Sequence, residues 1–437
     1  MQVNREILRL ALPSILANIT IPLVGLVDTA IVGHISDASA IGGIAVGTML
    51  FDLLYWNFGF LRVGTSGMTA QAYGRENREE CARLLCQSTG MALAGALAIW
   101  LLQWVFVTLV LACVPCSDEV ATFARRYFFV RVWAAPATLS LMALKGWFIG
   151  MQDTVTPMVT DIVVNVVNIV ASYLLAVHSP LGALGVAHGT VIAQYTGLCV
   201  AIGVIALKYK KIWSGLSLRT LLRDRSDLGR LLRLNGNLFV RSLCFMVVYV
   251  GFTSLASKYG DTELAVSSIM MKLFMLFSYF VDGFAYAGEA LVGRFIGDEE
   301  KHSEVNDVVK TLFIWSLGVG VVFTLLFAWL AQPMYRLMTS DMDILTAIED
   351  YTPWLVAMPI VSSLAFMWDG VYTGATAGRE IRNGMIFAAL GFVIGYVLTY
   401  RLWGVHAIYV GYFLHLIARV VYLSIEWSKV YDRAVSK

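Results

Sequence analysis

Long apolar segments recur along the whole chain, and each has about the length of a membrane-spanning helix. A helix needs roughly 20 apolar residues to cross the hydrocarbon core of a bilayer. Only 14% of the residues are charged, whereas about 25% are charged in a typical soluble domain. The sequence therefore predicts an all-α integral membrane protein with twelve transmembrane helices in the lipid bilayer. The twelve segments lie near residues 7–33, 43–64, 84–113, 124–150, 157–177, 183–207, 235–257, 264–291, 308–331, 350–375, 384–402 and 405–427.

One long polar segment, at residues 208–233, separates the sixth apolar segment from the seventh. Basic residues accumulate on the cytoplasmic side of membrane proteins, and most of the other lysines and arginines fall in connections on the same side. We therefore expect a multi-pass protein with both termini in the cytoplasm. Its parts would be an N-terminal six-helix lobe at 1–207, a cytoplasmic linker at 208–233 and a C-terminal six-helix lobe at 234–437. The basic residues of the linker are Lys208, Lys210, Lys211, Arg219, Arg223, Arg225, Arg230 and Arg233.

The two halves of the chain resemble each other when one is shifted by 224 residues along the other. Six segments in each half, both starting on the same side, predict two pseudo-symmetric lobes related by an axis normal to the membrane. Repeats of this kind place a substrate site near the midplane. Glycine is common, so chance matching is the alternative. The glycines that the shift aligns are Gly59 with Gly283, Gly64 with Gly288, Gly146 with Gly370, and Gly150 with Gly374.

Asp28 lies deep in the first apolar segment, far from the nearest basic residue of that segment, Arg9. Ionisable groups inside a membrane default to a functional or a paired role. A carboxyl group in apolar surroundings can exchange a proton, so Asp28 is a candidate proton carrier; a carboxylate held by hydrogen bonds for packing alone is the alternative. Pro13 and Pro22 precede it, and each removes a backbone hydrogen bond. We therefore expect a helix that can bend next to a titrating acid.

The fifth apolar segment carries a polar stripe formed by Asp161, Asn165, Asn168 and Ser172. Their spacing of four, three and four residues places them on one face of a helix. A polar face in a membrane must point inward, so we expect the stripe to line the core of the N-terminal lobe, where it could hydrogen-bond Asp28. The alternative is packing between helices with no role in transport.

The C-terminal half contains a second candidate polar site, with Asp369 and Arg241 as its main members and Asp282 as a further acid. Under the 224-residue shift, Asp369 falls where Lys145 stands in the first half, so the two opposite charges could face each other across a cleft. Asp369 is thus either a salt-bridge residue or a second ion site. Other charged residues lie near predicted helix ends, where their side chains could reach the interface. These residues are Arg62, Arg131, Glu289 and Arg419.

Three short motifs resemble those of the multidrug and toxic compound extrusion (MATE) transporters. They are Val-Asp-Thr-Ala-Ile-Val-Gly-His at 27–34, Lys-Gly-Trp-Phe-Ile-Gly-Met-Gln-Asp-Thr-Val-Thr-Pro at 145–157 and Trp-Asp-Gly-Val-Tyr-Thr-Gly at 368–374. The similarity extends over essentially the whole chain and is closest to the DNA-damage-inducible (DinF-type) branch. The resemblance implies two six-helix lobes, a monomer in a bacterial inner membrane, and export of amphipathic, often cationic, organic compounds in exchange for H⁺ or Na⁺.

The resemblance also implies roles for individual residues. Asp28 matches the family's first-helix carboxylate, whose protonation is proposed to bend the helix, and Pro13 matches a proline of that helix. Asn165 and Asn168 match polar positions of the fifth helix, whereas Ser172 stands where some relatives carry an acid.

In the C-terminal half, Asp369 matches a residue of a cation site in some relatives. The seventh segment offers Arg241 and no acid, which puts a Na⁺ site there in doubt. We therefore expect H⁺ rather than Na⁺ as the coupling ion, with no cofactor and no bound metal.

Two other functions remain open at this point. A flippase for lipid-linked precursors would keep the fold and use cationic residues such as Arg62, Lys145, Arg241 and Lys272. A membrane-embedded enzyme is disfavoured because the six histidines are dispersed and no segment has the spacing of metal ligands or of a nucleophile and its base. The net charge of +2 gives no indication of a nucleic-acid partner.

Overall fold

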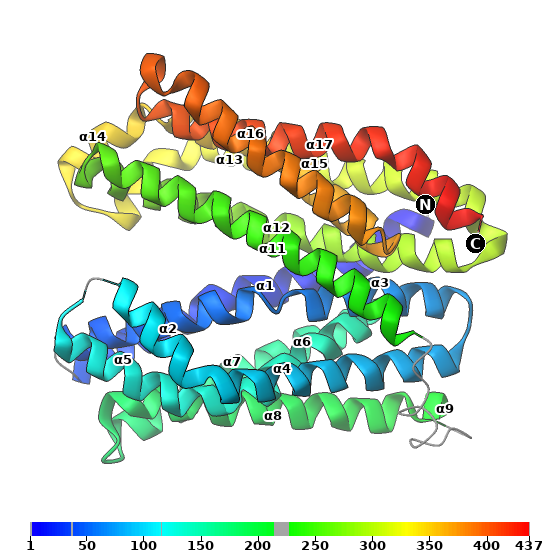
Figure 1. Cartoon of the computed structure of the whole chain (residues 1–437), viewed down its shortest axis with the longest axis horizontal. Coiled ribbons are helices and arrows are strands. Elements are labelled where there is room, and N and C mark those ends of the chain that lie inside the picture. Colours follow the sequence, from blue (N-terminus) through cyan, green and yellow to red (C-terminus); the bar gives the residue numbers. More distant parts are fainter. Residues whose placement is uncertain (1, 36–37, 115, 214–226, 437) are drawn as a thin grey trace. The chain divides into compact units, whose positions relative to one another are not determined.

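The computed structural model describes residues 2–35, 38–114, 116–213 and 227–436, and these residues form helices joined by short connections (Figure 1). Apolar segments form helices in a membrane because the backbone must satisfy its own hydrogen bonds there. The first half contains α1 (Gln2–Ile35), α2 (Ala38–Trp56), α3 (Phe60–Gly74), α4 (Arg78–Cys113), α5 (Asp118–Arg131), α6 (Ala135–Gly150), α7 (Val155–Val177), α8 (Gly185–Lys208) and α9 (Lys210–Trp213). The second half contains α11 (Leu228–Ala256), α12 (Asp261–Gly297), α13 (Val305–Met338), α14 (Met342–Glu349), α15 (Thr352–Gly374), α16 (Gly378–Trp403) and α17 (His406–Val435).

The prediction of twelve transmembrane helices is confirmed. Within the described residues, 11 helical segments are long and apolar enough to cross a membrane, and the 34-residue helix α1 is the twelfth. Two of the spans are built from two helices each. The span Ala40–Gly74 comprises α2 and α3, and the span Asp118–Gly150 comprises α5, a short 3₁₀ turn and α6.

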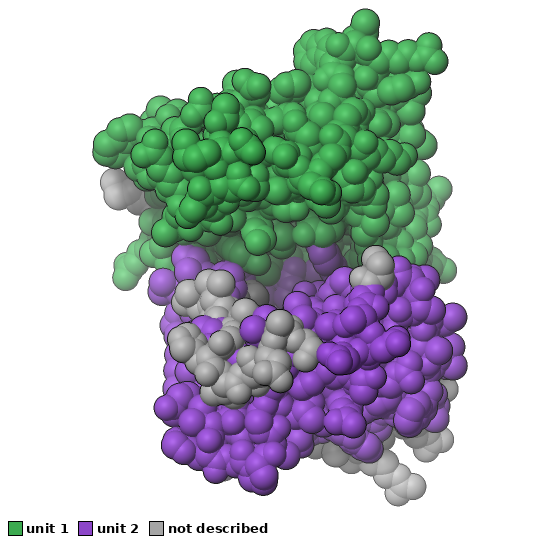
Figure 2. Space-filling model, turned by 90° about the vertical axis from the view of Figure 1, so that its left-hand side faces the viewer, with its two compact units in different colours: residues 1–15, 232–437 green, residues 16–231 purple. Residues whose placement is uncertain are grey.

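The chain divides into two compact units, which Figure 2 shows in different colours. Unit 1 contains Met1–Ile15 and Leu232–Lys437, and unit 2 contains Leu16–Leu231. Each has its own apolar core, centred on residues such as Phe274 and Tyr409 in unit 1 and Phe51 and Phe128 in unit 2. This division differs from the predicted lobes in placing the first 15 residues with the second half. Residues 214–226 of the predicted linker lie outside the described part of the chain.

The predicted repeat is visible in how the helices pack within each unit. In unit 2, α3 packs against α4 and α6, α4 and α8 pack against α6, and α7 packs against α8. Unit 1 has the equivalent pairs: α12 packs against α13 and α15, α13 and α17 pack against α15, and α16 packs against α17. The two halves therefore build the same arrangement of helices from sequences that share few side chains.

Glycines aligned by the shift lie at close helix crossings in both units. A Cβ atom added at Gly146 on α6 would lie 2.2 Å from the carbonyl oxygen of Arg62 on α3. A Cβ at Gly370 on α15 would lie 2.3 Å from the carbonyl oxygen of Ala285 on α12. Small residues allow membrane helices to approach this closely. The sequence match at these positions thus has a packing reason and is not a chance match.

The turns after these helices are also equivalent. Gln152 and Thr376, which the shift aligns, both have a left-handed backbone, with φ of 62° and 54°. Such a residue commonly ends a helix and lets the next amides bond back to the last carbonyl groups. The bonds run from the amide of Asp153 to the oxygen of Phe148 (2.9 Å) and from the amide of Ala377 to the oxygen of Tyr372 (3.0 Å).

A buried carboxylate holds the turn between α6 and α7 in unit 2. Asp153 accepts hydrogen bonds from Lys208 Nζ (2.6 Å), the Tyr209 hydroxyl (2.8 Å) and both the hydroxyl (2.6 Å) and the amide (3.1 Å) of Thr156. Burial alone would raise the pKa of Asp153, but these hydrogen bonds outweigh it and hold the pKa below its usual range. The turn is therefore fixed to the end of α8 by a charged contact.

Candidate functional site

Asp28 lies on α1 within unit 2 and is half-buried. One of its carboxylate oxygens is buried and has no hydrogen-bond partner among the described residues. The carboxyl group lies close enough to the Ser172 side chain of α7 and to Arg131 of α5 to interact electrostatically with both. Side chains from α1, α5 and α7 thus bring a carboxyl group, a guanidinium group and a hydroxyl group together within one unit.

The polar stripe on α7 points toward the interior of unit 2 at two of its positions. Asn168 is 4% exposed and Ser172 is fully buried. Asn168 donates to the Thr190 hydroxyl of α8 at 3.0 Å, and Ser172 donates to the Asn168 carbonyl oxygen at 3.3 Å. Side-chain hydrogen bonds therefore link α8 to Asn168 and Ser172 of α7, and Ser172 in turn lies close to Asp28 on α1. The stripe thus contacts the neighbouring helix α8 and lies close to Asp28, and its role in transport stays a prediction.

Asn165 contacts α1 one turn further along the same stripe. Its side-chain amide donates to the Thr20 hydroxyl at 2.6 Å, and Thr20 in turn donates to the Ala17 carbonyl oxygen at 2.7 Å. This bond ties α7 to the segment of α1 that precedes Asp28. If α1 moves in this region, either this hydrogen bond breaks or α7 moves together with α1.

Asp161, the first residue of the stripe, has a partner of its own. Its carboxylate accepts a hydrogen bond from Lys145 Nζ of α6 at 2.6 Å, and both side chains are largely buried. The expectation that Lys145 faces Asp369 needs correction, because Lys145 lies in unit 2 and pairs there with Asp161. The short turn between α6 and α7 explains the pairing, since it places two residues equally far from the turn at the same depth.

Arg131 is a member of this site that the sequence interpretation missed. It was expected near a helix end, with its charge at the interface, but it is the last residue of α5 and lies inside the span Asp118–Gly150. Its guanidinium group donates to the Tyr127 hydroxyl at 3.0 Å and lies 4.8 Å from the ring centre of Phe51. The helix starts at Asp118, earlier than apolarity alone indicates, and this moves Arg131 into the interior.

Pro13 and Pro22 both lie within α1, which is helical on both sides of each proline. Pro13 is half-buried and Pro22 is exposed. Both are candidates for bending α1 because proline leaves one carbonyl group of the helix without its usual donor. Their role in bending stays a prediction.

The second candidate site, in unit 1, is an ion-paired cluster. Asp369 on α15 accepts a hydrogen bond from Arg241 of α11 at 2.5 Å and also pairs with Arg419 of α17. Of the two alternatives for Asp369, the structure shows the salt bridge. Arg419 was expected to reach the interface, yet its side chain is 2% exposed. The helix α17 extends to Val435, so Arg419 lies near its middle.

Asp282, the remaining member proposed for this site, lies on α12 and is half-buried. Among the residues that the structure describes, no three His, Cys, Asp or Glu side chains group closely enough to hold a metal ion. The acids at issue instead lie next to arginine, lysine or hydroxyl groups. This chemistry suits proton exchange and ion pairing.

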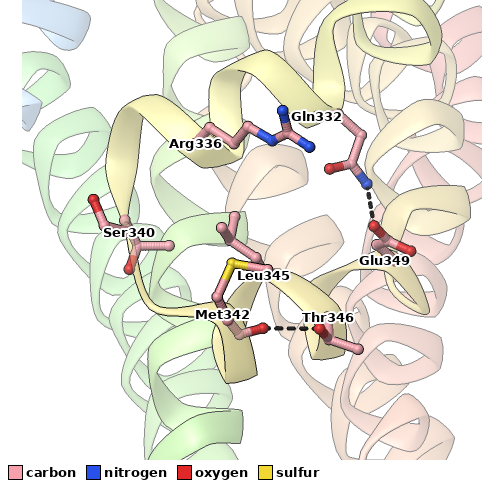
Figure 3. Close-up of a pocket in the computed structure, with 8 residues that line it drawn as sticks. Gln332, Arg336, Ser340, Met342, Leu345, Thr346 and Glu349 are labelled. Carbon is pink, nitrogen blue, oxygen red and sulfur yellow. Dashed lines mark hydrogen bonds between the residues drawn. The ribbon is translucent and has the colours of Figure 1, made fainter.

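A separate surface hollow lies at the turn between α13 and α14 (Figure 3). The Gln332 amide donates to Glu349 at 2.8 Å on one side of it, and the Arg336 side chain points toward the same space. Its other lining residues include Met342 and Leu345. The hollow is lined by exposed and half-buried side chains of α13, α14 and the turn between them, and none of its lining residues belongs to either candidate site.

Comparison with known proteins identifies relatives over nearly the full length of the chain. The chain is 35% identical over 428 residues to DNA damage-inducible protein F of Escherichia coli K12, covering 98% of this chain and 92% of that protein. It is 25% identical to Protein DETOXIFICATION 44, chloroplastic, of Arabidopsis thaliana, covering 96% and 81%. It is 24% identical to multidrug and toxin extrusion protein 1 of Oryctolagus cuniculus, covering 98% and 76%.

Solved structures show the same fold. The chain superposes with a TM-score of 0.87 on a MATE protein crystallised in complex with MaD3S, at 16% identity and covering 100% and 97% of the two chains. It superposes with a TM-score of 0.84 on a Vibrio cholerae MATE transporter in the bent form, at 16% identity and covering 100% and 97%.

The profile of one family, described as MatE, matches the chain twice, at residues 13–174 and 238–401. The two matches start almost the same distance apart as the 224-residue shift that aligns the glycines of the two halves. The proteins of this family are transporters and not enzymes. By these matches, the chain belongs to the MATE family of membrane transporters.

Proposed function

We propose that this protein exports amphipathic organic compounds in exchange for protons, and that Asp28 carries the proton. The observation that supports this most directly is the environment of Asp28. One carboxylate oxygen is buried without a hydrogen-bond partner among the described residues, while Ser172 and Arg131 lie next to the same carboxyl group. A neutral acid would fill the empty position with its own proton, and a carboxylate would be stabilised by the arginine.

Two other acids of the candidate sites are less suited to this task. Asp161 is bonded to Lys145, and Asp369 is paired with two arginines. A carboxylate held by a neighbouring cation has little tendency to take up a proton, because protonation would leave the cation buried without its counter-charge. This comparison supports Asp28 as the coupling residue.

The same environment supports H⁺ over Na⁺. Hard cations such as Ca²⁺ and Mg²⁺ are held by six or more oxygen ligands, and Na⁺ needs a similar oxygen-rich shell. Near Asp28 the fixed positive charge of Arg131 would repel a metal cation. The oxygens of Asn168 and Ser172 are already engaged in hydrogen bonds with each other.

Export would follow from alternation of the charge on Asp28. On the outer side the acid takes up a proton and substrate is released; on the inner side it loses the proton, α1 returns to its original form and substrate binds. Moving one charge across ~150 mV supplies about 3.5 kcal/mol, which supports a concentration ratio of roughly 300. One titrating carboxyl group is therefore sufficient.

The proposed location is the inner membrane of a bacterium, with both termini in the cytoplasm. The relative in Escherichia coli supports the bacterial location, and the positive charge of the predicted cytoplasmic connections supports the orientation. Export of organic compounds is supported by the names of relatives such as multidrug and toxin extrusion protein 1.

The test is transport by purified protein in liposomes, with an imposed pH gradient or an imposed Na⁺ gradient and a panel of cationic and anionic amphipathic dyes. We expect efflux driven by the pH gradient in the wild type and its loss in Asp28→Asn. Asp307→Asn, which removes an exposed acid of α13, is the matched control and should transport normally. Efflux that a Na⁺ gradient alone drives, and that Asp28→Asn retains, would overturn the assignment.

A further inference from the structure

We propose that the Arg241–Asp369–Arg419 cluster of unit 1 binds an anionic group of the transported compound, so that the substrate is an amphipathic organic anion. The proposal builds on the export function proposed above and specifies its substrate class. It differs from the cationic compounds that the family resemblance implies. Its basis is the balance of charges in the cluster.

The cluster contains two guanidinium groups and one carboxylate, which leaves one positive charge in excess. Asp369 is paired with both arginines. The excess charge is enclosed, because the side chains of Arg419 and Asp369 are 2% and 12% exposed. A buried ion without a counter-charge is strongly unfavourable, and inside a membrane such groups mark substrate or ion pathways. An anion bound here would neutralise the cluster.

The three helices that form the cluster contribute a further titratable group, His415. It lies on α17 one turn before Arg419, is fully buried and interacts electrostatically with both Arg419 and Asp369. Histidine is neutral or positive, so it does not supply the missing negative charge. Among the described residues, the ionisable side chains that interact with the Asp369 carboxylate are thus two arginines and one histidine, and none of them carries a negative charge.

Arg241 is the member that could reach a ligand. Its side chain is 24% exposed, twice as much as that of Asp369. One end of its guanidinium group bonds Asp369, while its Nε atom is buried without a hydrogen-bond partner among the described residues. Arginine can donate two parallel hydrogen bonds to a carboxylate, sulfonate or phosphate. Asp369 would hold the guanidinium group in place while the ligand bonds its remaining donors.

Apolar rings next to the cluster suit the other part of an amphipathic ligand. Arg419 lies 5.8 Å from the ring centre of Phe366, and Phe245 of α11 packs against His415 with ring centres 6.5 Å apart. Both phenylalanines are half-buried. An anionic head on an apolar body would thus find a matching partner for each part, whereas a cationic head would meet a net positive charge.

The test compares two ligands with the same ring system and opposite charge, 1-naphthylacetate and 1-naphthylmethylammonium. Binding to the purified full chain in nanodiscs of zwitterionic lipid is measured by equilibrium dialysis, without any ion gradient. We expect the anion to bind at least tenfold more tightly than the cation. Arg241→Ala should reduce anion affinity about tenfold or more, and Arg241→Lys should restore part of it. Arg401→Ala, which removes an exposed charge of α16, should change neither affinity.

Asp369 keeps Arg419 as a partner in Arg241→Ala, so this variant leaves no unpaired carboxylate. The comparison of the two ligands on the wild type needs no variant and remains decisive if a variant fails to fold. Tighter binding of the cation by the wild type, or unchanged anion affinity in folded Arg241→Ala, would overturn the proposal. Because no gradient is applied, these results are independent of whether Asp28 couples transport to protons.

A last measurement distinguishes two sources of the anionic group. Dihexanoylphosphatidylglycerol, a short-chain lipid with a phosphate, is added as a competitor of 1-naphthylacetate. Displacement that depends on Arg241 supports an anionic group carried by a lipid phosphate, as in a lipid-linked precursor. Arg241-dependent binding of 1-naphthylacetate without displacement supports a soluble organic anion.

Discussion

The close crossing at Gly146 gives a sharp prediction for the stability of unit 2. In Gly146→Ala the new methyl group would lie 2.2 Å from the Arg62 carbonyl oxygen, whereas Cβ atoms essentially never come within 3.0 Å of another heavy atom. The obstacle is backbone, so no rotamer change removes it, and α6 has to move away from α3 by roughly 1 Å. A gap of 0.5–1 Å already loses a quarter to a half of each van der Waals contact.

The resulting cost falls at the upper end of the range for overpacked cores, about 3 kcal/mol. We expect the apparent melting temperature of the purified protein to fall by on the order of 5 °C. Gly370→Ala should cause a similar loss in unit 1, because its methyl group would lie 2.3 Å from the Ala285 carbonyl oxygen. The measurement is thermal unfolding in detergent, followed by size-exclusion chromatography.

The matched control is Gly203→Ala on α8, where an added Cβ meets no other atom within 4 Å. Alanine favours a helix over glycine by up to about 1 kcal/mol, so this variant should melt at or slightly above the wild-type temperature. If the melting temperatures of Gly146→Ala and Gly203→Ala differ by less than about a degree, α6 and α3 do not approach each other as closely as described. A lower melting temperature in Gly146→Ala but not in Gly370→Ala would contradict the equivalence of the two helix crossings.

Two further contacts can be tested in the same way. Lys145→Ala leaves the Asp161 carboxylate without its 2.6 Å partner, so it should be less stable than Lys145→Ala/Asp161→Ala by about 1–3 kcal/mol; equal melting of the two variants would argue against the pair. Hydrogen bonds, including that from Lys208, hold the pKa of Asp153 below its usual range, so its stabilising effect is complete above about pH 4 and is lost at lower pH. Asp153→Asn should therefore lower the melting temperature at pH 7, and the difference from the wild type should shrink only below about pH 4. A difference that already disappears at pH 6 would contradict the assignment.

The fold could be predicted from the sequence because a membrane leaves few choices to the backbone. The predicted segment 183–207 and the helix α8 (Gly185–Lys208) differ by only two residues at one end. Aligned glycines indicated the repeat, and their contacts supply the reason. The ends of helices that extend into polar sequence were not predictable in this way. For this reason Arg131 and Arg419 are predicted near the ends of their spans, whereas Arg131 lies inside the span Asp118–Gly150 and Arg419 lies near the middle of α17.

The partners of the charged residues were only partly accessible from the sequence. Lys145 and Asp161 lie on consecutive helices at similar distances from a short turn, so their pairing could have been predicted. Arg419 and Asp369 are 50 residues apart on helices that are not consecutive. Their pairing depends on the packing of α17 against α15, which no local pattern reveals. The electrostatic interaction between Asp28 and Arg131 likewise requires the three-dimensional arrangement of unit 2.

The two halves keep the same backbone while their charges have diverged. Lys145 and Asp369 stand at equivalent positions, yet the first is neutralised by a carboxylate and the second by two arginines. Among the described residues, Asp28 of unit 2 is paired with no cation at salt-bridge distance, whereas Asp369 of unit 1 is paired with two arginines, which leaves that cluster one positive charge in excess. With the functions proposed above, a backbone that tolerates either sign at the same position would let unit 2 bind the coupling ion and unit 1 bind an anionic group. On this reasoning, reversing the charge at residue 241 should alter which compounds are bound but should not alter which ion drives their export.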